Sequence, residues 1–206
     1  MKVLSSEPRV FASSAGLLNL SGMSRRAWLL AFIVLAAAVA ILVAMGRNPI
    51  CSCGSVDLWV GTRDSPETSQ MLSDWYSLSH IVHGLIFYAA LWLLARRRPL
   101  EWRFLTALLI EAVWEVVENT PFVIDRYRAT TAALGYTGDS VVNSLSDILM
   151  MALGFLAARK LPVRVTVLVL LALEIIPLFT IRDNLTLNVW ALMSPNKALQ
   201  AWQAGR

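Results

Sequence analysis

Five segments of the chain consist largely of apolar residues, and three of them are interrupted by polar residues at regular intervals. A helix needs about 20 mostly apolar residues to cross about 30 Å of hydrocarbon. The pattern therefore predicts five membrane-spanning helices, at residues 28–45, 75–95, 102–119, 141–158 and 163–181. The expected fold class is an all-α integral membrane protein, a bundle of about five transmembrane helices.

The polar residues of the three middle segments share helix faces, since residues three or four apart lie on one side of an α-helix. A charge in hydrocarbon costs at least a few kcal/mol, so ionisable residues there indicate a functional site. Polar residues that only hold helices together contribute about 0.6 kcal/mol each, which does not explain so many carboxylates. The candidate catalytic residues are His80, His83, Glu111, Glu115, Glu118, Asp139, Asn143 and Asp147.

Basic residues gather in short segments beside the predicted helices, namely 25–26, 96–103 and 159–164. Short loops rich in Lys and Arg remain on the cytoplasmic side of a membrane. The expected orientation places the N-terminus in the cytoplasm and the C-terminus on the extracytoplasmic side. At a rise of 1.5 Å per residue, the three polar faces fall in the outer half of the bilayer. They are expected to form one pocket that opens outward.

The composition excludes an ordinary soluble domain, because 57% of the 206 residues are hydrophobic and only 16% are charged. The formal net charge of +4 could indicate a nucleic-acid partner, but the basic residues follow the loops and are a topology signal. The expected partner is therefore the lipid bilayer and not a nucleic acid. Both a monomer and a homo-oligomer are compatible with the sequence.

The chain is expected to hold a single transmembrane domain, residues 23–206, after a polar and flexible extension at residues 1–22. Met23 directly precedes Ser24, Arg25 and Arg26, so it is an alternative start of the protein. The first apolar run is longer than the 7–15 residues of a signal-peptide core, which favours an uncleaved anchor over a secretory signal.

Two histidines among several carboxylates are ligand types that suit zinc and other divalent ions. The candidate metal ligands are His80, His83, Glu115 and Asp139, although their spacing matches no established zinc signature. Without an ion, a histidine and a glutamate can act as general acid and base. A proton-coupled transporter would use the same residues as a relay. The sequence therefore leaves the cofactor open, and zinc is the candidate that these residue types favour.

The segment 120–138 is predicted to be a loop above the pocket, in which Gly138 and Asp139 suit a turn and a helix N-cap. Guanidinium groups match phosphates and carboxylates, so the loop is expected to hold the head group of an anionic lipid or isoprenoid-linked substrate. Weak surface ion pairs are the alternative. The candidate substrate-binding residues are Asp125, Arg126, Arg128 and Tyr136.

Three further features each allow two interpretations. Glu174 either completes the pocket or pairs with Arg182. Cys51 and Cys53 either form a disulfide, in a compartment that allows oxidation, or contribute to a metal site. Apolar residues at i, i+4 and i+7 near the C-terminus predict either a short helix in the outer membrane interface or a frayed tail. These apolar residues are Leu185, Val189 and Leu192.

A larger set of residues forms a specific motif after Met23. Its members are His80, His83, Gly84, Glu111, Trp114, Glu115, Glu118, Asn119, Asp125, Arg126, Tyr127, Arg128, Gly138, Asp139, Ser140, Asn143, Ser144 and Asp147. With this motif the chain resembles a family of uncharacterised bacterial multi-pass inner-membrane proteins. The resemblance implies a multi-pass protein of the bacterial inner (cell) membrane, with the C-terminus in the periplasm, and no known activity.

The order His83, Glu115, Asp139 and Asn143 resembles, more distantly, the pattern of VanZ-like membrane proteins. In that pattern a helix with histidine precedes a helix with glutamate and then a D-x-x-x-N helix. The resemblance implies an association with glycopeptide resistance at the cell envelope. The chain departs from the pattern by its additional ionisable residues, which are His80, Glu111, Glu118 and Asp147.

The combined interpretation is an envelope protein with an outward-facing intramembrane site of histidines and carboxylates. The leading hypothesis is a hydrolase or transferase that acts on a lipid-linked or other envelope substrate. A proton- or cation-coupled binding or transport protein is the first alternative. An envelope scaffold, in which the polar rows would tolerate substitution, is the second.

Overall fold

The computed structural model describes residues 23–131 and 135–205, so the polar extension expected at residues 1–22 lies outside the described residues. Within the described residues the chain forms eight helices and no β-strand, which confirms the all-α prediction. The helices are α1 Arg25–Ala44, α2 Ser77–Ala95, α3 Leu100–Glu118, α4 Pro121–Thr130, α5 Val141–Lys160, α6 Val163–Ile181, α7 Leu185–Met193 and α8 Lys197–Gln203.

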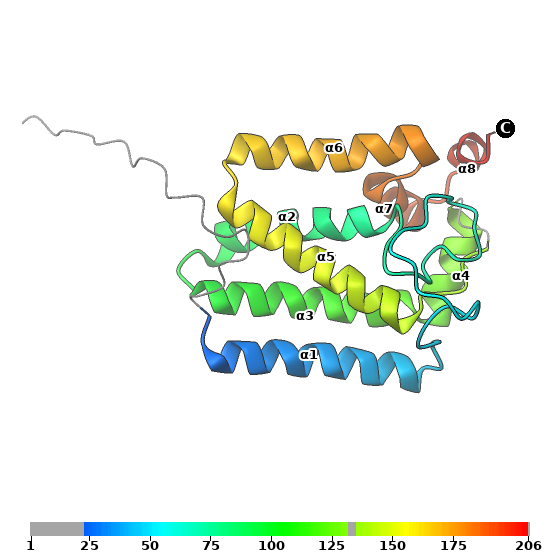
Figure 1. Ribbon diagram of the computed structural model, residues 1–206. Helices are drawn as coiled ribbons and strands as arrows, with labels where there is room; N and C mark the ends of the chain where they lie inside the picture. Colours follow the sequence, from blue (N-terminus) through cyan, green and yellow to red (C-terminus); the bar gives the residue numbers. More distant parts are fainter. Residues whose placement is uncertain (1–22, 132–134, 206) are drawn as a thin grey trace, which may run out of the picture.

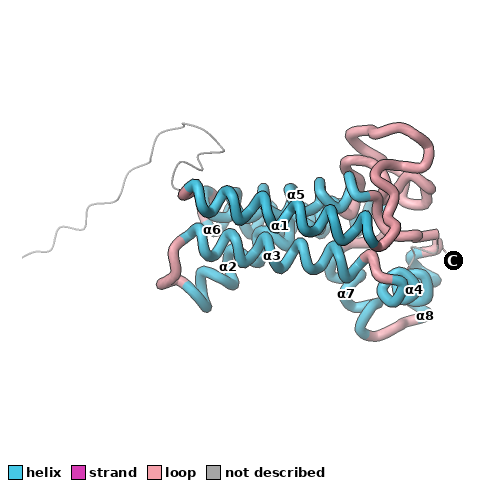
Figure 2. Tube along the Cα trace, turned by 90° about the horizontal axis from the view of Figure 1, so that it is seen from below, coloured by secondary structure: helices cyan, strands magenta, loops and turns pink. Residues whose placement is uncertain are grey.

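The five long helices, α1, α2, α3, α5 and α6, lie side by side as a bundle (Figure 1). The short helices α4, α7 and α8 gather at one end of it, together with the long segment 45–76 that joins α1 to α2. Figure 2 shows the same separation from below, with short turns at the opposite end. Nine of the 15 Lys and Arg residues in the described part of the chain lie at this end, in or within four residues of the turns 96–99 and 161–162 or at the start of α1. The bundle therefore has a basic end and an elaborated end.

Four of the described helices, α1, α2, α5 and α6, are long and apolar enough to cross a membrane. Their outer faces carry large exposed apolar side chains, such as Phe32, Leu94 and Phe179. The fifth predicted span, α3, is equally long but carries too many charged residues to qualify by composition. It nevertheless lies in contact with α1, α2 and α5. Two of its glutamates, Glu111 and Glu115, point into the protein, as both are fully buried.

Helices α2 and α5 cross in direct backbone contact because each has a glycine at the crossing point. A Cβ atom at Gly84 would overlap the carbonyl oxygen of Met151, and one at Gly154 would overlap that of Ile81. Small residues at helix interfaces allow this kind of close approach in membranes. The contact places the polar face of α2 directly against that of α5. Beneath it, Phe155 packs edge-on against both Tyr88 and Phe104 in the apolar core.

The prediction that residues 120–138 form a loop is wrong for most of its length, because the structure contains helix α4 there. Thr120 is the N-cap, where its side chain accepts a hydrogen bond from the backbone N–H of Val123, and Pro121 occupies the first helical position. Both are favoured helix-start signals. The polar character of the segment obscured them.

The predicted N-cap at Asp139 is also wrong by one position. Ser140 caps α5, since its Oγ accepts from the backbone N–H of Asn143 at 3.1 Å. The same hydroxyl donates to the carbonyl of Gln70, and the Asn143 side chain donates to the carbonyl of Met71. These contacts fix the start of α5 to the segment that precedes α2.

Cys51 and Cys53 form a disulfide, which settles the alternatives left by the sequence. Cys51 is buried with Val60 and Met71 in a small second core. The disulfide therefore belongs to the packing of the long segment at the elaborated end.

Candidate functional site

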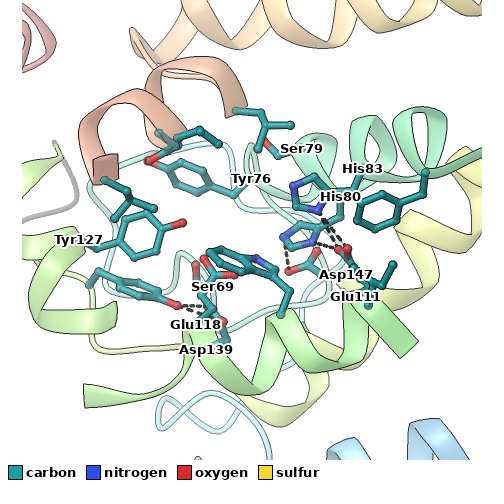
Figure 3. Close-up of a pocket in the computed structure, with 18 residues that line it drawn as sticks. Ser69, Tyr76, Ser79, His80, His83, Glu111, Glu118, Tyr127, Asp139 and Asp147 are labelled. Atoms are coloured by element: carbon teal, nitrogen blue, oxygen red, sulfur yellow. Dashed lines mark hydrogen bonds and ion pairs between the residues drawn. The ribbon is translucent and has the colours of Figure 1, made fainter. Parts of the chain in front are cut away.

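A cavity of about 320 Å³ lies at the elaborated end of the bundle, and both polar and apolar side chains line it (Figure 3). Binding pockets for small molecules start at about this size. Its lining is Ser69, Tyr76, Ser79, His80, His83, Phe87, Ile110, Glu111, Trp114, Glu118, Tyr127, Tyr136, Asp139, Asp147, Leu185, Asn188, Val189 and Leu192. The polar residues form two groups, one around the histidines and one around the tyrosines.

The histidine end consists of His80, His83, Glu111, Glu115 and Asp147. Oε1 of Glu111 lies 2.6 Å from Nδ1 of His80 and 3.0 Å from Nδ1 of His83. Nδ1 of His80 also lies 3.3 Å from Oε1 of Glu115. On its other side, Nε2 of His80 lies 3.8 Å from Oδ2 of Asp147. One imidazole thus stands among three carboxylates, contributed by α3 and α5.

Two carboxylates of the histidine end have oxygen atoms without a hydrogen bond. Among the described residues, neither carboxylate oxygen of Glu115 has a hydrogen-bond partner, and the same holds for Oδ1 of Asp147. Glu115 has an exposed fraction of 0% and Asp147 one of 5%. Buried polar groups are nearly always hydrogen-bonded, and an unsatisfied one calls for an explanation such as a catalytic role or a bound ion.

The tyrosine end consists of Glu118, Asn119, Tyr127, Tyr136 and Asp139, and its polar atoms are paired. The Asn119 side chain donates to Oδ2 of Asp139 at 2.8 Å and accepts from the backbone N–H of Asp139 at 2.7 Å. The Tyr136 hydroxyl donates to the same carboxylate at 3.0 Å. Tyr127 is hydrogen-bonded to Glu118. These bonds tie the end of α3 and the end of α4 to the start of α5.

Burial determines how the groups of the tyrosine end ionise. Burial raises the pKa of Asp139 to about 6, although the hydrogen bonds from Asn119 and Tyr136 oppose the rise. Burial, together with the carboxylates nearby, also raises the pKa of Tyr127 and Tyr136 well above the usual range. Both phenols therefore stay protonated and act as hydrogen-bond donors at neutral pH.

Helix α7 covers one side of the cavity with an apolar face. Leu185, Val189 and Leu192, at the i, i+4 and i+7 positions, all line the cavity. The short helix that the spacing predicts is confirmed, and the frayed tail is excluded. Helix α7 thereby adds an apolar wall opposite the ionisable residues of α2, α3 and α5.

Charged side chains hold α7 at both ends. The Glu174 carboxylate accepts hydrogen bonds from the backbone N–H groups of Leu185 and Thr186 in the first turn. The Arg126 guanidinium donates twice to the carbonyl of Leu192 near the last turn. An acid at the N-terminus and a base at the C-terminus both match the helix dipole. Glu174 therefore neither lines the cavity nor pairs with Arg182, the two alternatives from the sequence.

The structure brings most of the predicted site residues together. Glu115 lies just behind the cavity wall at the histidine end, whereas Asn143 faces Met71 and does not line the cavity. The predicted substrate-binding residues other than Tyr136 also lie off the cavity lining. Asp125 is exposed, and Arg128 donates to the carbonyl of Tyr136 at 2.5 Å. The predicted residues that line it are His80, His83, Glu111, Glu118, Tyr136, Asp139 and Asp147.

Several cavity residues were not predicted. Tyr76 lies at the N-cap of α2, one helical turn before His80, and its hydroxyl donates to Asp183 Oδ2 at 3.2 Å. Tyr127 lies on α4, where an i, i+3 or i+4 pattern could have been sought had the helix been expected. Asn188 of α7 shares the helix face of the predicted apolar residues. The spacing rule could have found Tyr76 and Asn188.

Two groups of described residues have the composition and spacing of a metal site. One is His80, His83 and Glu111, and the other is His80, Glu115 and Glu118. Within each group the ligand atoms lie within 4.8 Å of one another. Of the four predicted metal ligands, Asp139 is in neither group, and Glu111 occurs where it was not expected.

Comparison with known proteins finds a family that matches most of the chain. A family described as "Protein of unknown function (DUF2585)" matches residues 42–205, which include every residue of the cavity. The chain belongs to the DUF2585 family. The resemblance to an uncharacterised family is thus confirmed.

Relatives that carry the name UPF0314 protein match over most of their own length. The UPF0314 protein of Sphingopyxis alaskensis is 52% identical over 184 residues, which cover 89% of this chain and 98% of the relative. That of Paracoccus denitrificans is 51% identical over 173 residues, which cover 84% and 90%. No solved structure matches the chain.

Proposed function

We propose that this DUF2585 protein is an inner-membrane enzyme that hydrolyses, or transfers, a group on a lipid-linked or isoprenoid-linked envelope substrate. The observation that carries the proposal is the cavity, which combines the buried His80, the half-buried His83 and buried carboxylates with an apolar wall. A polar reacting group would meet the histidine end, while an attached hydrocarbon chain would lie against α7. The distant resemblance to VanZ-like proteins agrees with a substrate of the cell envelope.

The location follows from the charge at the two ends of the bundle. The basic turns lie at one end, and the residues that line the cavity lie toward the other. If the basic end is cytoplasmic, the cavity is on the periplasmic side. Helix α3 completes a five-helix membrane domain, with its charged residues turned toward the other helices. Reporter fusions at Asp64 and Ser194 should be active outside the cytoplasm and one at Pro99 inside it; the reverse pattern contradicts the proposal.

The histidine end can supply the groups that such a reaction needs. In hydrolysis, Glu115 or a histidine takes a proton from water, and the water oxygen bonds to the phosphorus or carbonyl carbon of the substrate. The bond to the leaving oxygen breaks, and that oxygen takes up a proton. In transfer, an acceptor hydroxyl replaces the water. Asp147 orients His80, whose Nε2 it faces. Asp139 orients the Asn119 and Tyr136 side chains, from which it accepts hydrogen bonds.

The proposal also gives the two arginines of α4 a smaller role, in binding the anionic head group of the substrate. Arg128 lies at the protein surface beside Asp125, with 42% of its side chain exposed, and can reach an anionic group outside the cavity. Arg126 already donates to Leu192. Arg126 therefore contributes to substrate binding mainly by holding α7 in place.

The test compares strains that differ only in this protein. Deletion of the gene and replacement by Glu115→Gln should change the same pool of lipids or envelope precursors, as measured by mass spectrometry. Wild type and Glu101→Gln should restore the pool. Glu101 is a matched control because it lies on the same helix at the basic end, where it accepts hydrogen bonds from Ser24. Restoration by Glu115→Gln, at equal amounts of folded protein, would contradict the proposal.

A second function is favoured by the unpaired oxygens of Glu115 and Asp147, which could take up and release a cation or proton. In this alternative the protein couples ion binding to transport. It predicts proton-dependent flux in vesicles that contain the purified protein, and no change of a covalent bond in any lipid. A scaffold would instead tolerate Glu115→Gln in both assays.

A further inference from the structure

We propose that the histidine end binds one divalent metal ion, with zinc as the best match, through Nδ1 of His80, Nδ1 of His83 and the Glu111 carboxylate. Nitrogen and carboxylate oxygen are common zinc ligands, with bonds of about 2.0–2.2 Å. In a tetrahedral site with such bonds, ligand atoms lie about 3.4 Å apart. The two nitrogens lie 2.6 and 3.0 Å from Glu111 Oε1, so small outward shifts would admit the ion.

The second ring nitrogen of His80, Nε2, also faces a carboxylate, at the distance of an ion pair rather than of a hydrogen bond. A metal-bound histidine almost always presents its other ring N–H to a carboxylate, a carbonyl or water, which fixes the ring. Nε2 of His80 faces Asp147 Oδ2 at 3.8 Å, whereas its Nδ1 faces Glu111. The helix crossing at Gly84 and Gly154 holds α2 and α5 in this arrangement. Asp147 is therefore a positioning residue for His80.

Glu115 supplies an independent sign of a bound cation. Its carboxylate is completely buried and points toward Nδ1 of His80 at 3.3 Å, yet neither oxygen has a hydrogen-bond partner among the described residues. A buried ionised carboxylate without partners is costly, and a metal ion removes that cost. The same holds for Oδ1 of Asp147, the third unpaired atom at this end. The histidine end thus has more carboxylates than imidazoles to neutralise them.

Three protein ligands leave coordination positions for other groups, which is the arrangement of catalytic rather than structural zinc. All three proposed ligands line the cavity, so water or a substrate oxygen can reach the ion. Glu115 stands near enough to serve as a further ligand or as the base for bound water. This use of the ion rests on the proposed function, whereas binding of the ion does not.

The experiment measures metal content in the full-length protein, purified in detergent without chelators. Inductively coupled plasma mass spectrometry should find about one zinc per chain, or saturable binding of about one added Zn²⁺. Both His83→Ala and Glu111→Gln should lose it, at least tenfold in affinity. Glu101→Gln is the matched control on α3 and should keep it, since Glu101 lies outside the cavity. Absence of zinc from the wild type, even after addition, or its retention by both variants, overturns the proposal.

A second variant tests the same site by the gain of a spectroscopic signal, in case His83→Ala does not fold. Nδ1 is the ring nitrogen nearest the backbone, so a cysteine at position 83 places its sulfur in a similar region. Co²⁺ bound to His83→Cys should show a thiolate-to-cobalt charge-transfer band that the wild-type Co²⁺ protein lacks. A Co²⁺-loaded His83→Cys protein without that band contradicts ligation at position 83. If the lipid pool changes on deletion but the purified protein binds no metal, metal binding is refuted and the proposed enzymatic function is not.

Discussion

At the tyrosine end of the cavity, Asp139 accepts hydrogen bonds from Asn119 and Tyr136, whereas at the histidine end Glu115 has none among the described residues. Both carboxylates are buried, and both belong to rows with the same helical spacing. A carboxylate whose bonds are complete fixes helices to one another. A carboxylate left without bonds costs stability unless a ligand completes it. In the proposed function, this difference makes Asp139 a positioning group and Glu115 the group that acts.

The largest expected effect concerns the helix crossing that supports the histidine end. Gly84→Ala or Gly154→Ala should force α2 and α5 apart, because the new Cβ atom meets backbone that cannot rotate away. The loss of stability should be about 3 kcal/mol or more, with little folded protein recovered from membranes. Size-exclusion chromatography and thermal unfolding in detergent measure it. Gly135→Ala is the control, as nothing lies within 4 Å of its Cβ position; equal stability of all three variants would contradict the close crossing.

The tyrosine end should depend most on Asn119. Asn119→Ala removes the donor to the Asp139 carboxylate and the acceptor for the Asp139 backbone N–H, and leaves both buried. The expected cost is about 2–3 kcal/mol, seen as a lower Tm. Asp125→Asn provides the comparison, because that carboxylate is exposed, and its Tm should not move. A Tm of Asn119→Ala equal to that of wild type would mean that the bonds of this end do not hold the bundle.

The dependence of stability on pH should separate the two ends further. The folded pKa of Asp139 is about 6, above its ordinary value of 3.8, because of burial. The folded state therefore holds this proton more tightly, and stability falls as pH rises from about 4 to about 6. Asp139→Asn should remove a fall on the order of 2 kcal/mol from the profile. Other buried acids contribute to the same window, so the difference between the wild-type and variant profiles is the quantity to measure; parallel profiles would show that Asp139 does not titrate there.

The smallest expected change in stability is the one that separates the ends most clearly. Glu115→Gln removes a charge that lacks hydrogen bonds, so Tm should stay the same or rise by the equivalent of about 1 kcal/mol. Function should nevertheless be lost. A clear fall in Tm would mean that Glu115, like Asp139, serves the fold. In that case the contrast between the two ends would disappear.

Much of the site could be predicted because it depends on helix periodicity. The spacing of Glu111 and Glu115 placed both on one face of α3, and the bounds of α6 agree with the predicted segment 163–181. The convergence of three helices on one cavity followed from the rise per residue, which puts the polar rows of all three helices in the same half of the membrane. These inferences use only local geometry, which the sequence encodes directly.

The rest depends on contacts between residues far apart in the chain. Ser140 and Asn143 looked like site residues or helix-bonding residues, but they pair with Gln70 and Met71, about seventy positions earlier. No periodicity indicates such a pairing. Helix α4 was missed for the opposite reason, since its start signals at Thr120 and Pro121 are local and were outweighed by a polar composition.

The attachment of α7 at both ends affects the timescale on which the cavity can admit a substrate. Swinging the helix away would break the contacts of Glu174 and of Arg126 together. Entry without that motion needs only rotations of Leu185, Val189 and Leu192. Side-chain rotations of exposed residues take picoseconds to nanoseconds, while collective motions of whole elements take microseconds or longer. A chain-like molecule could therefore exchange quickly past a wall whose backbone stays still.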